Sequence, residues 1–481
     1  NEYILQNSVN LAVSLQKLGL KKGDLVGLSS ENRFEFLVAA LAVIYCGGVL
    51  STLNITYSPG EISHLLKITK PKFIFTSPIT SQNIYDCCHE LSYTCKLIMF
   101  GEFDVVPDCI MYDNLIKDHV NVEDFTLTDV SGVDDTVAVM CSSGTTGLPK
   151  GVELTHVNFL TLSPAVVKNN GIITGLSLIP WFHAYGFITT LAVMAMNIKI
   201  VFLIRFDEEQ YLETIQNYKI NMTTIVPPLA VFLAKHPLVL KYDLSSLVEV
   251  WCGAAPLSKD IQKAVSKRYI VFTYGLQFTY SGGHIIRNTD LHFHFQSFLT
   301  CKTGFLSIYM VIDIENGKKL GAGQEGELWI KSPLRMKGYM GDRAASDELF
   351  DSEGYIRTGD IGYYDPDGYF YIVDRLKELI KYKGFQVAPA ELEALLLQHS
   401  GVADVGVVGL PDEAAGELPL AFVVAQPNSN VTENDLVQFV VSPAKRLRGG
   451  VIFLKDVPKN ASGKILRREL RKMLQKYKSK L

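Results

Sequence analysis

The pattern of apolar and polar positions predicts alternating helices and strands through most of the chain. Leucine and valine residues recur near helical spacing up to Gly19 and predict a first helix. The apolar run 24–28 predicts a strand, 35–45 predicts an apolar helix, and 71–76 predicts another strand. Because strands that alternate with helices form parallel sheets covered by those helices, the sequence predicts an α/β fold.

The alternation continues and then changes character. We expect further strands at 137–141, 177–180, 198–203, 223–228 and the start of 247–257, and a loop at 52–54. Beyond 326–330 the apolar runs become short and Gly/Asp turns frequent. The stretch Asp365-Pro366-Asp367-Gly368 predicts a hairpin turn between strands at 362–364 and 369–373.

A chain of 481 residues exceeds a single hydrophobic core, so we expect two domains. The first, 1–376, would be a large domain of parallel-rich sheets covered by helices. The second, 377–481, would be a small α+β domain rich in lysine.

Composition narrows the class of protein. Hydrophobic residues make up 48% and charged residues 20%, as in soluble globular proteins, and the net charge of −4 argues against a general nucleic-acid binder. The eight scattered cysteines predict reduced thiols in an intracellular protein rather than a disulfide frame or zinc site. The apolar stretches 36–50 and 187–204 are expected to be buried, with no membrane span and no signal peptide.

The densest candidate for chemistry is a ten-residue run after the strand 137–141. It holds three glycines, four hydroxyls and one lysine: Ser142, Ser143, Gly144, Thr145, Thr146, Gly147, Leu148, Pro149, Lys150 and Gly151. Glycines let backbone N–H groups approach an anion, hydroxyls add donors and Lys150 adds a charge, so the run favours a polyphosphate ligand. It lacks the spacing of a Walker A loop, and the alternative is a solvent-exposed turn.

This run, followed by Leu154-Thr155-His156, resembles the phosphate loop of adenylate-forming enzymes: acyl-CoA synthetases, 4-coumarate–CoA ligases and beetle luciferases. The resemblance extends over nearly the whole chain, although the opening few dozen residues of the family are expected to be missing. It implies an N-terminal AMP-binding domain and a small domain that rotates about a hinge at Lys377.

His183 lies in the aromatic stretch Trp181-Phe182-His183-Ala184-Tyr185-Gly186. A histidine among aromatic residues is often a core residue with a satisfied ring. The resemblance instead implies a place at the acyl site, where His183 would orient the substrate carboxylate. Tyr185, Phe187 and Leu276 would then form apolar walls of the acid pocket.

Small residues at 253–255 mark a candidate adenine site. Gly253, Ala254 and Ala255 would let a flat ring lie against the backbone, or they form an ordinary tight turn after a strand. The resemblance implies that Tyr274 stacks on the adenine.

Asp360 and Arg375 are candidates for ribose binding. A carboxylate at a strand end can accept hydrogen bonds from both ribose hydroxyls, and Asp360 matches the family's ribose-binding aspartate. Arg375 matches a residue that contacts ribose or phosphate. The alternative is an exposed Asp–Arg salt bridge.

The second domain offers two candidate lysines. The resemblance implies that Lys464 binds ATP and the acyl carboxylate during adenylation, and that Lys381 faces the site during thioester formation. Gly384, beside Lys381, would let the pantetheine arm of CoA pass close to the backbone. One basic group could meet the phosphates of CoA or merely solvate a loop: Lys445, Arg446 and Arg448.

One segment interrupts the resemblance. After 274–276 the family continues with Thr-Glu, and that glutamate holds Mg²⁺, whereas this chain has Gln277 and Phe278. The metal ligand is therefore unknown, and the stretch to about Met310 matches the family nowhere. It is either genuine divergence or a splicing or gene-annotation error.

Together these residues predict an acid–CoA ligase that uses ATP, CoA and Mg²⁺. The carboxylate of a fatty or aryl acid would attack the α-phosphate of ATP, Mg²⁺ and Lys464 would spread the negative charge, and CoA would then displace AMP. One alternative is a luciferase-type monooxygenase acting on luciferyl-adenylate. The other is a non-catalytic nucleotide- or acyl-binding relic.

The chain ends in Ser479-Lys480-Leu481. This tripeptide matches the address that the peroxisomal import receptor reads at a free C-terminus. The sequence therefore predicts a peroxisomal location.

Overall fold

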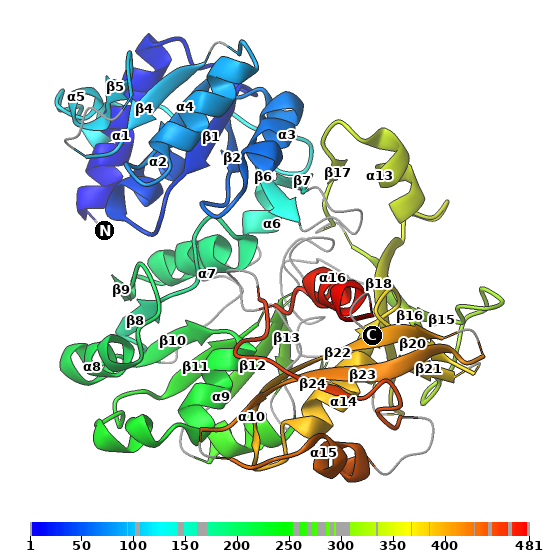
Figure 1. Cartoon of the computed structure of the whole chain (residues 1–481). Helices are drawn as coiled ribbons and strands as arrows, with labels where there is room; N and C mark the ends of the chain where they lie inside the picture. The colour runs from blue at the N-terminus through cyan, green and yellow to red at the C-terminus, as the bar shows by residue number, and fades with distance from the viewer. Residues whose placement is uncertain are drawn as a thin grey trace.

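The structure is a computed structural model of the whole chain. It describes residues 2–93, 95–101, 106–142, 149–160, 171–253, 259–267, 271–276, 285–288, 293–294, 308–332, 335–366, 368–383, 385–412, 414–427, 429–440, 445–459 and 464–478. Three sheets and their helices make up this part of the chain, with the first sheet at the upper left of Figure 1, the second below it and the third at the lower right.

The first sheet has eight strands, and its central strands run parallel. In spatial order they are β17 (Gly338–Tyr339), β7 (Lys150–Thr155), β6 (Thr136–Ser142), β2 (Val49–Thr52), β1 (Leu25–Ser29), β3 (Phe73–Thr76), β4 (Lys96–Met99) and β5 (Ile110–Met111). The accompanying helices are α1 (Glu2–Lys17), α2 (Phe34–Tyr45), α3 (Pro59–Thr69), α4 (Ser81–Glu90), α5 (Tyr112–Leu115), the 3₁₀ turn η1 (Val122–Asp124) and α6 (His156–Leu160).

The second sheet has eleven strands and is parallel at one side only. In order they are β15 (Ile308–Ile312), β16 (Gly326–Lys331), β18 (Ile356–Tyr364), β19 (Tyr369–Arg375), β14 (Phe293–His294), β13 (Ile285–Asn288), β12 (Val271–Leu276), β11 (Glu249–Cys252), β10 (Met222–Ile225), β8 (Thr174–Ser177) and β9 (Lys199–Phe202). Its helices are α7 (Ala184–Ala195), α8 (Glu208–Tyr218), α9 (Pro227–Lys235), η2 (Pro237–Lys241), α10 (Lys259–Ser266) and α13 (Arg343–Leu349). The strands β9, β8, β10, β11 and β12 are mutually parallel, and the rest pair antiparallel.

The third sheet is small and mostly antiparallel. Its strands are β21 (Phe385–Val387), β20 (Ile380–Tyr382), β23 (Gly416–Ala425) and β22 (Val402–Asp412), with β24 (Val451–Phe453) parallel to β23. Its helices are α14 (Pro389–Leu396), α15 (Glu433–Phe439) and α16 (Arg467–Lys478). A separate apolar cluster, which includes Ile380, Leu392 and Val407, fills this part.

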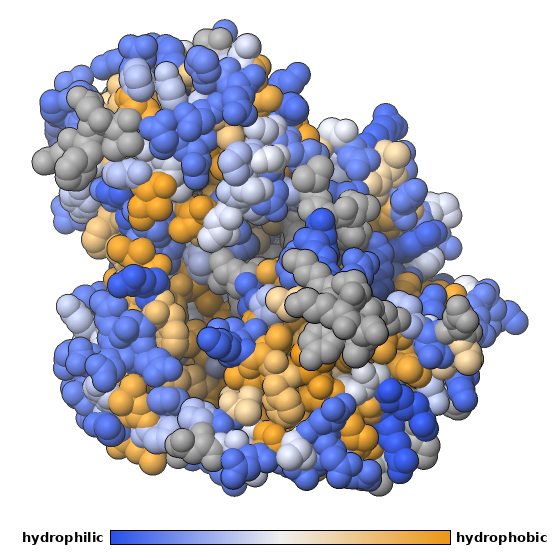
Figure 2. Space-filling view, viewed as in Figure 1, coloured by the Kyte–Doolittle hydropathy of each residue, from blue (hydrophilic) through white to orange (hydrophobic). Residues whose placement is uncertain are grey.

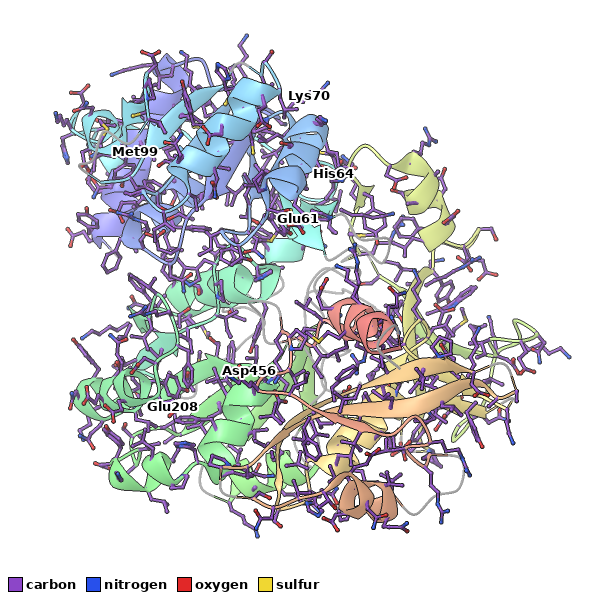
Figure 3. All side chains as sticks on the ribbon, in the orientation of Figure 1. Glu61, His64, Lys70, Met99, Glu208 and Asp456 are labelled. Atoms are coloured by element: carbon purple, nitrogen blue, oxygen red, sulfur yellow. The ribbon has the colours of Figure 1, made fainter. Side chains whose placement is uncertain are left out.

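Local sequence explains the helix boundaries. A capping box starts α3: the Ser58 N–H donates to the Glu61 carboxylate at 2.9 Å, and Glu61 is marked on this helix in Figure 3. The residues of α2 are apolar on nearly every face of the helix, so this helix is buried between the first two sheets. Its Phe36 packs edge-on against Trp181 at 5.9 Å and Phe187 at 6.0 Å, which joins both sheets in one core.

The structure confirms the α/β class and most predicted elements, with three corrections. The strand β2 was missed because its four residues directly follow an apolar helix and two glycines, and Thr52 belongs to it rather than to a loop. The strand β8 ends at Ser177, because residues 178–183 leave the sheet and turn toward the first one. The strand β10 ends at Ile225, since Pro227 starts α9.

The second apolar stretch forms α7 followed by β9, as predicted. None of the helices in the described part is both long and apolar enough to span a membrane. The seven cysteines that lie in that part are free thiols.

Candidate active site

The phosphate-loop run joins β6 to β7. These strands pair antiparallel, with Ser142 opposite Lys150 at the end of the hairpin where the connecting run begins. Residues Ser143, Gly144, Thr145, Thr146 and Gly147 lie outside the described residues, as does the side chain of Ser142. The described part therefore fixes the base of the loop and the position of its lysine.

Lys150 is held in place by residues of the β17–α13 segment. Its Nζ atom lies 3.1 Å from the Asp342 carboxylate and 4.7 Å from the centre of the Tyr339 ring. Asp342 also caps α13 through the Ala345 N–H at 3.0 Å. This N–H and Lys150 both lower the pKa of Asp342, which keeps the carboxylate charged as a partner for the lysine.

His183 lies at the start of α7, where the chain leaves the turn after β8. Its Nε2 atom is buried and has no hydrogen-bond partner among the described residues. Burial lowers the pKa of His183 to about 4, so the ring is neutral at pH 7. A neutral imidazole with a free nitrogen can donate or accept one hydrogen bond to a ligand.

The predicted walls of the acid pocket lie deep in the fold. The Tyr185 hydroxyl donates to the Trp251 carbonyl at 2.8 Å, and Phe187 is fully buried against Phe36 and Phe159. The Leu276 side chain lies outside the described residues, although the residue ends β12. Their place in an acid pocket stays a prediction.

The candidate adenine residues follow two neighbouring strands. Gly253 comes directly after β11, and its N–H donates to the Ile225 carbonyl at 3.1 Å. Tyr274 lies on the adjacent β12, with its side chain outside the described residues, as are Ala254 and Ala255. In parallel sheets, ligands bind in the crevice at the carboxyl ends of the strands, where Gly253 and the turn that carries His183 lie. Figure 2 shows the surface hollowed between the parts built on the first and second sheets, with apolar side chains at its margin.

The structure brings Asp360, Arg375 and Lys464 together. The Arg375 Nε atom lies 3.0 Å from the Asp360 Oδ1 atom, and Asp360 is buried. Burial raises the pKa of Asp360, while the charges of Arg375 and Lys464 oppose that rise. The pKa of Lys464 is lowered to about 8 by burial and by Arg375, with Asp360 acting in the opposite direction. The three groups therefore share one electrostatic environment around the buried Asp360 carboxylate.

Lys464 is carried by the segment between β24 and α16, on which Figure 3 marks Asp456. The ends of its loop are pinned together by a bridge between Lys459 and Ile465. Lys459 in turn binds the Asp404 carboxylate of β22 at 2.5 Å. This attachment explains how a lysine in a basic, C-terminal stretch is held near the buried Asp360 carboxylate.

Lys381 lies in the third sheet. It is exposed on β20, and its N–H donates to the Glu417 carboxylate at 2.9 Å. Gly384 lies outside the described residues, and the expected hinge residue Lys377 is exposed in the turn after β19. Among the basic residues left open, Lys445 pairs with Glu391, and Arg448 lies over the Tyr382 ring at 5.4 Å.

The donor set offers little for a metal. Gln277 and Phe278 lie outside the described residues, and the described ranges contain no group of three His, Cys, Asp or Glu side chains that could hold an ion. The Glu327 carboxylate, which lies near Asp360, accepts from the Gly359 N–H and the Trp329 indole, both at 2.9 Å. We therefore derive no step through a protein-bound Mg²⁺.

Sequence reasoning missed two residues that organise this region. Asp342 could have been found, because an aspartate directly before a short helix is a common cap. Asn32, which binds the turn before His183, carries no such signal.

Comparison with known proteins identifies the family. Residues 4–340 match the family described as AMP-binding enzyme, and residues 391–464 match the AMP-binding enzyme C-terminal domain. A luciferin 4-monooxygenase of Photuris pensylvanica is 40% identical over 500 residues, covering 100% of this chain and 90% of the relative. A probable 4-coumarate–CoA ligase 3 of Dictyostelium discoideum is 35% identical, covering 98% and 89%.

Solved structures agree at the level of the fold. ATP-bound MatB from Rhodopseudomonas palustris superposes with a TM-score of 0.84 at 25% identity, covering 98% of this chain and 92% of that one. A red-emitting luciferase from Phrixothrix hirtus reaches 0.69 at 38% identity, covering 98% and 90%. The chain belongs to the family of AMP-binding, adenylate-forming enzymes.

Proposed function

We propose that this chain is an acid–CoA ligase that converts a fatty or aryl acid to its acyl-adenylate and then to a thioester. The observation that carries the proposal is the group formed by the buried Asp360 carboxylate with Arg375 and Lys464. It supplies an acceptor for ribose hydroxyls and two cations for a phosphate, from β18, β19 and the segment before α16.

In the first half-reaction, an oxygen of the acid carboxylate forms a bond to the α-phosphorus of ATP and the bond to pyrophosphate breaks. The Lys464 ammonium faces the negative charge that develops. The neutral His183 ring donates one hydrogen bond to the acid and holds its reactive oxygen in place, without needing to release a proton.

In the second half-reaction, the thiolate of CoA attacks the acyl carbonyl and AMP leaves. Lys381 is exposed on β20, and its N–H binds Glu417, whereas Lys464 acts on Asp360. This difference supports a second arrangement for thioester formation, in which the small domain would turn about Lys377. Mg²⁺ would enter with ATP, bound through its phosphates.

A luciferase is the second candidate, because the 40% identity to a luciferin 4-monooxygenase slightly exceeds that to the ligases. Both form the same kind of adenylate. The full chain should be incubated with ATP, CoA and a panel of aryl and fatty acids, and acid-dependent pyrophosphate exchange and acyl-CoA mass measured beside light emission with luciferin. Thioester formation supports the ligase, light without thioester supports the luciferase, and ATP binding without either supports a relic.

We also propose that the protein is imported into peroxisomes, with Ser479-Lys480-Leu481 read by the import receptor. Residues 479–481 lie outside the described residues, so this proposal rests on the sequence.

A further inference from the structure

The turn that presents His183 is bound by side chains of the other sheet. Asn32, three residues after β1, accepts from the Trp181 N–H at 2.8 Å through its Oδ1 atom. Its Nδ2 atom donates to the carbonyls of Ile179 at 3.2 Å and Leu203 at 3.4 Å. Asn32 is 3% exposed, so all its polar atoms depend on these partners.

Thr52 makes the next contact along the same turn. Its hydroxyl, fully buried at the end of β2, donates to the Phe182 carbonyl at 2.8 Å. Thr52 pairs with Leu28 in the sheet, so both binding residues come from the carboxyl ends of adjacent parallel strands. Together they bind the peptide units at 179, 181 and 182, directly before His183.

The His183 ring has little else to fix it. Its Nε2 atom is buried without a partner in the described part, and the ring packs at 4.7 Å against that of Phe182. The His183 N–H donates to the Pro180 carbonyl at 3.1 Å, inside the same turn. The position of the imidazole therefore follows from the backbone of residues 179–183.

We infer that Asn32 and Thr52 are positioning residues, which place the His183 imidazole for the acid substrate by binding the turn before it. This inference rests on the proposed role of His183. It assigns part of acid recognition to two residues at the carboxyl ends of β1 and β2 in the first sheet.

The first test uses the ring itself and needs no substrate. Diethyl pyrocarbonate modifies accessible neutral imidazoles, and its rate at His183 can be followed by peptide mass spectrometry in the full chain. Thr52→Val removes one buried hydrogen bond, so the turn before His183 should open more often. The labelling rate of His183 should then rise about fivefold. Thr52→Ser keeps the hydroxyl and should restore the slow rate.

Two controls separate local from general loosening. Thr69→Val removes an equally buried hydroxyl, which donates to the Leu65 carbonyl at 2.8 Å in α3, and should leave His183 protected. The Nε2 atom of His156 is buried and has no hydrogen-bond partner within the described ranges, so His156 serves as an internal reference. Unchanged labelling of His183 in both Thr52→Val and Asn32→Leu, or an equal rise at His156, would overturn the inference.

The second test separates this inference from the proposed function. With 4-coumarate and with laurate as probe acids, Thr52→Val should raise the KM for the acid about tenfold and leave the KM for ATP unchanged. In a His183→Ala background the same change should have almost no further effect, because Thr52 acts through the ring. If His183→Ala alone leaves the KM for the acid unchanged, the proposed role of His183 is wrong. If His183→Ala raises this KM but Thr52→Val raises it by its full factor again, the positioning role of Thr52 is wrong.

Discussion

The Nε atom of Arg375 lies 3.0 Å from the Oδ1 atom of Asp360, and the two residues face each other across β18 and β19. The Asp360 side chain is only 7% exposed, and burial raises its pKa. Two cations, Arg375 and Lys464, act against that rise. The two cations therefore favour the charged form of the Asp360 carboxylate, whereas burial disfavours it.

Removing Arg375 should shift the loss of activity at acidic pH to a higher pH. In Arg375→Met the pKa of Asp360 rises further, so the carboxylate is protonated, and lost as a ribose acceptor, at a higher pH than in the wild type. The pH profile of kcat/KM for ATP in pyrophosphate exchange measures this shift. Arg357→Met, which removes an exposed guanidinium lying 5.0 Å from the Trp329 ring, should cause no such shift.

Lys464 should determine the pH at which adenylation declines on the alkaline side of the pH–activity profile. Because its pKa is lowered to about 8, the ammonium loses its proton as pH rises through about 8, and adenylation should fall there. Lys464→Arg keeps the charge at every accessible pH, so the alkaline decline of kcat/KM for ATP should disappear even if the rate is lower. A decline that persists in Lys464→Arg would assign this loss of activity to another group.

Replacing either candidate lysine should reduce activity in a different assay. Lys464→Ala should abolish pyrophosphate exchange, because the ammonium near Asp360 is lost, while Lys381→Ala should mainly slow thioester formation from preformed acyl-AMP. Lys455→Ala, an exposed change on the segment that carries Lys464, is the matched control. Equal losses in both assays for both variants would contradict two separate arrangements.

The chain should adenylate weakly while still binding ATP. Phe278 has no oxygen for a metal where the family has glutamate, and losing about 3–4 kcal/mol of metal assistance slows a step about 100- to 1,000-fold. ATP binding by calorimetry and acid-dependent exchange measure the two properties separately. A large recovery in Gln277→Thr/Phe278→Glu would place the defect at the metal, and a small one would place it in 279–310; full turnover by the unaltered chain would refute the prediction.

The last dozen residues should direct a fluorescent fusion to peroxisomes. Deleting Leu481 should leave the fusion in the cytosol, because the receptor reads the free terminus. Colocalisation with a peroxisomal marker measures both. A cytosolic signal from the intact tail would exclude this address.

The sequence was sufficient for what depends on local pattern. Hydrophobic periodicity predicted α1, α2 and β1, and turn residues predicted the β18–β19 hairpin. The strand β2 escaped because four residues after two glycines give too little periodicity to separate from a loop. The early end of β8 could not be predicted, since it depends on where the following turn is bound.

Long-range relationships needed the structure. Asn32 binds Ile179 and Leu203, which lie 147 and 171 residues further along the chain, and no spacing rule connects them. The grouping of Lys464 with Asp360 came only from resemblance, because a lysine in a basic stretch is usually solvated. The partnership of Lys150 with Asp342 spans 192 residues and was not predicted at all.

One strand, β23, connects the surroundings of both candidate lysines. Near its start, Glu417 accepts the Lys381 N–H. Near its end, Val424 lies opposite Asp404, which binds Lys459 at the base of the Lys464 loop.

The two attachment points are seven residues apart on this strand, about 23 Å at the rise of an extended chain. A paired strand does not stretch or fold back, so a turn of the proposed small domain that brought one lysine to Asp360 would carry the other away with it. The two proposed half-reactions would then not compete for the pocket at the same moment. The enzyme would use one site for two successive reactions, because the length of β23 keeps the two lysines from reaching that site together.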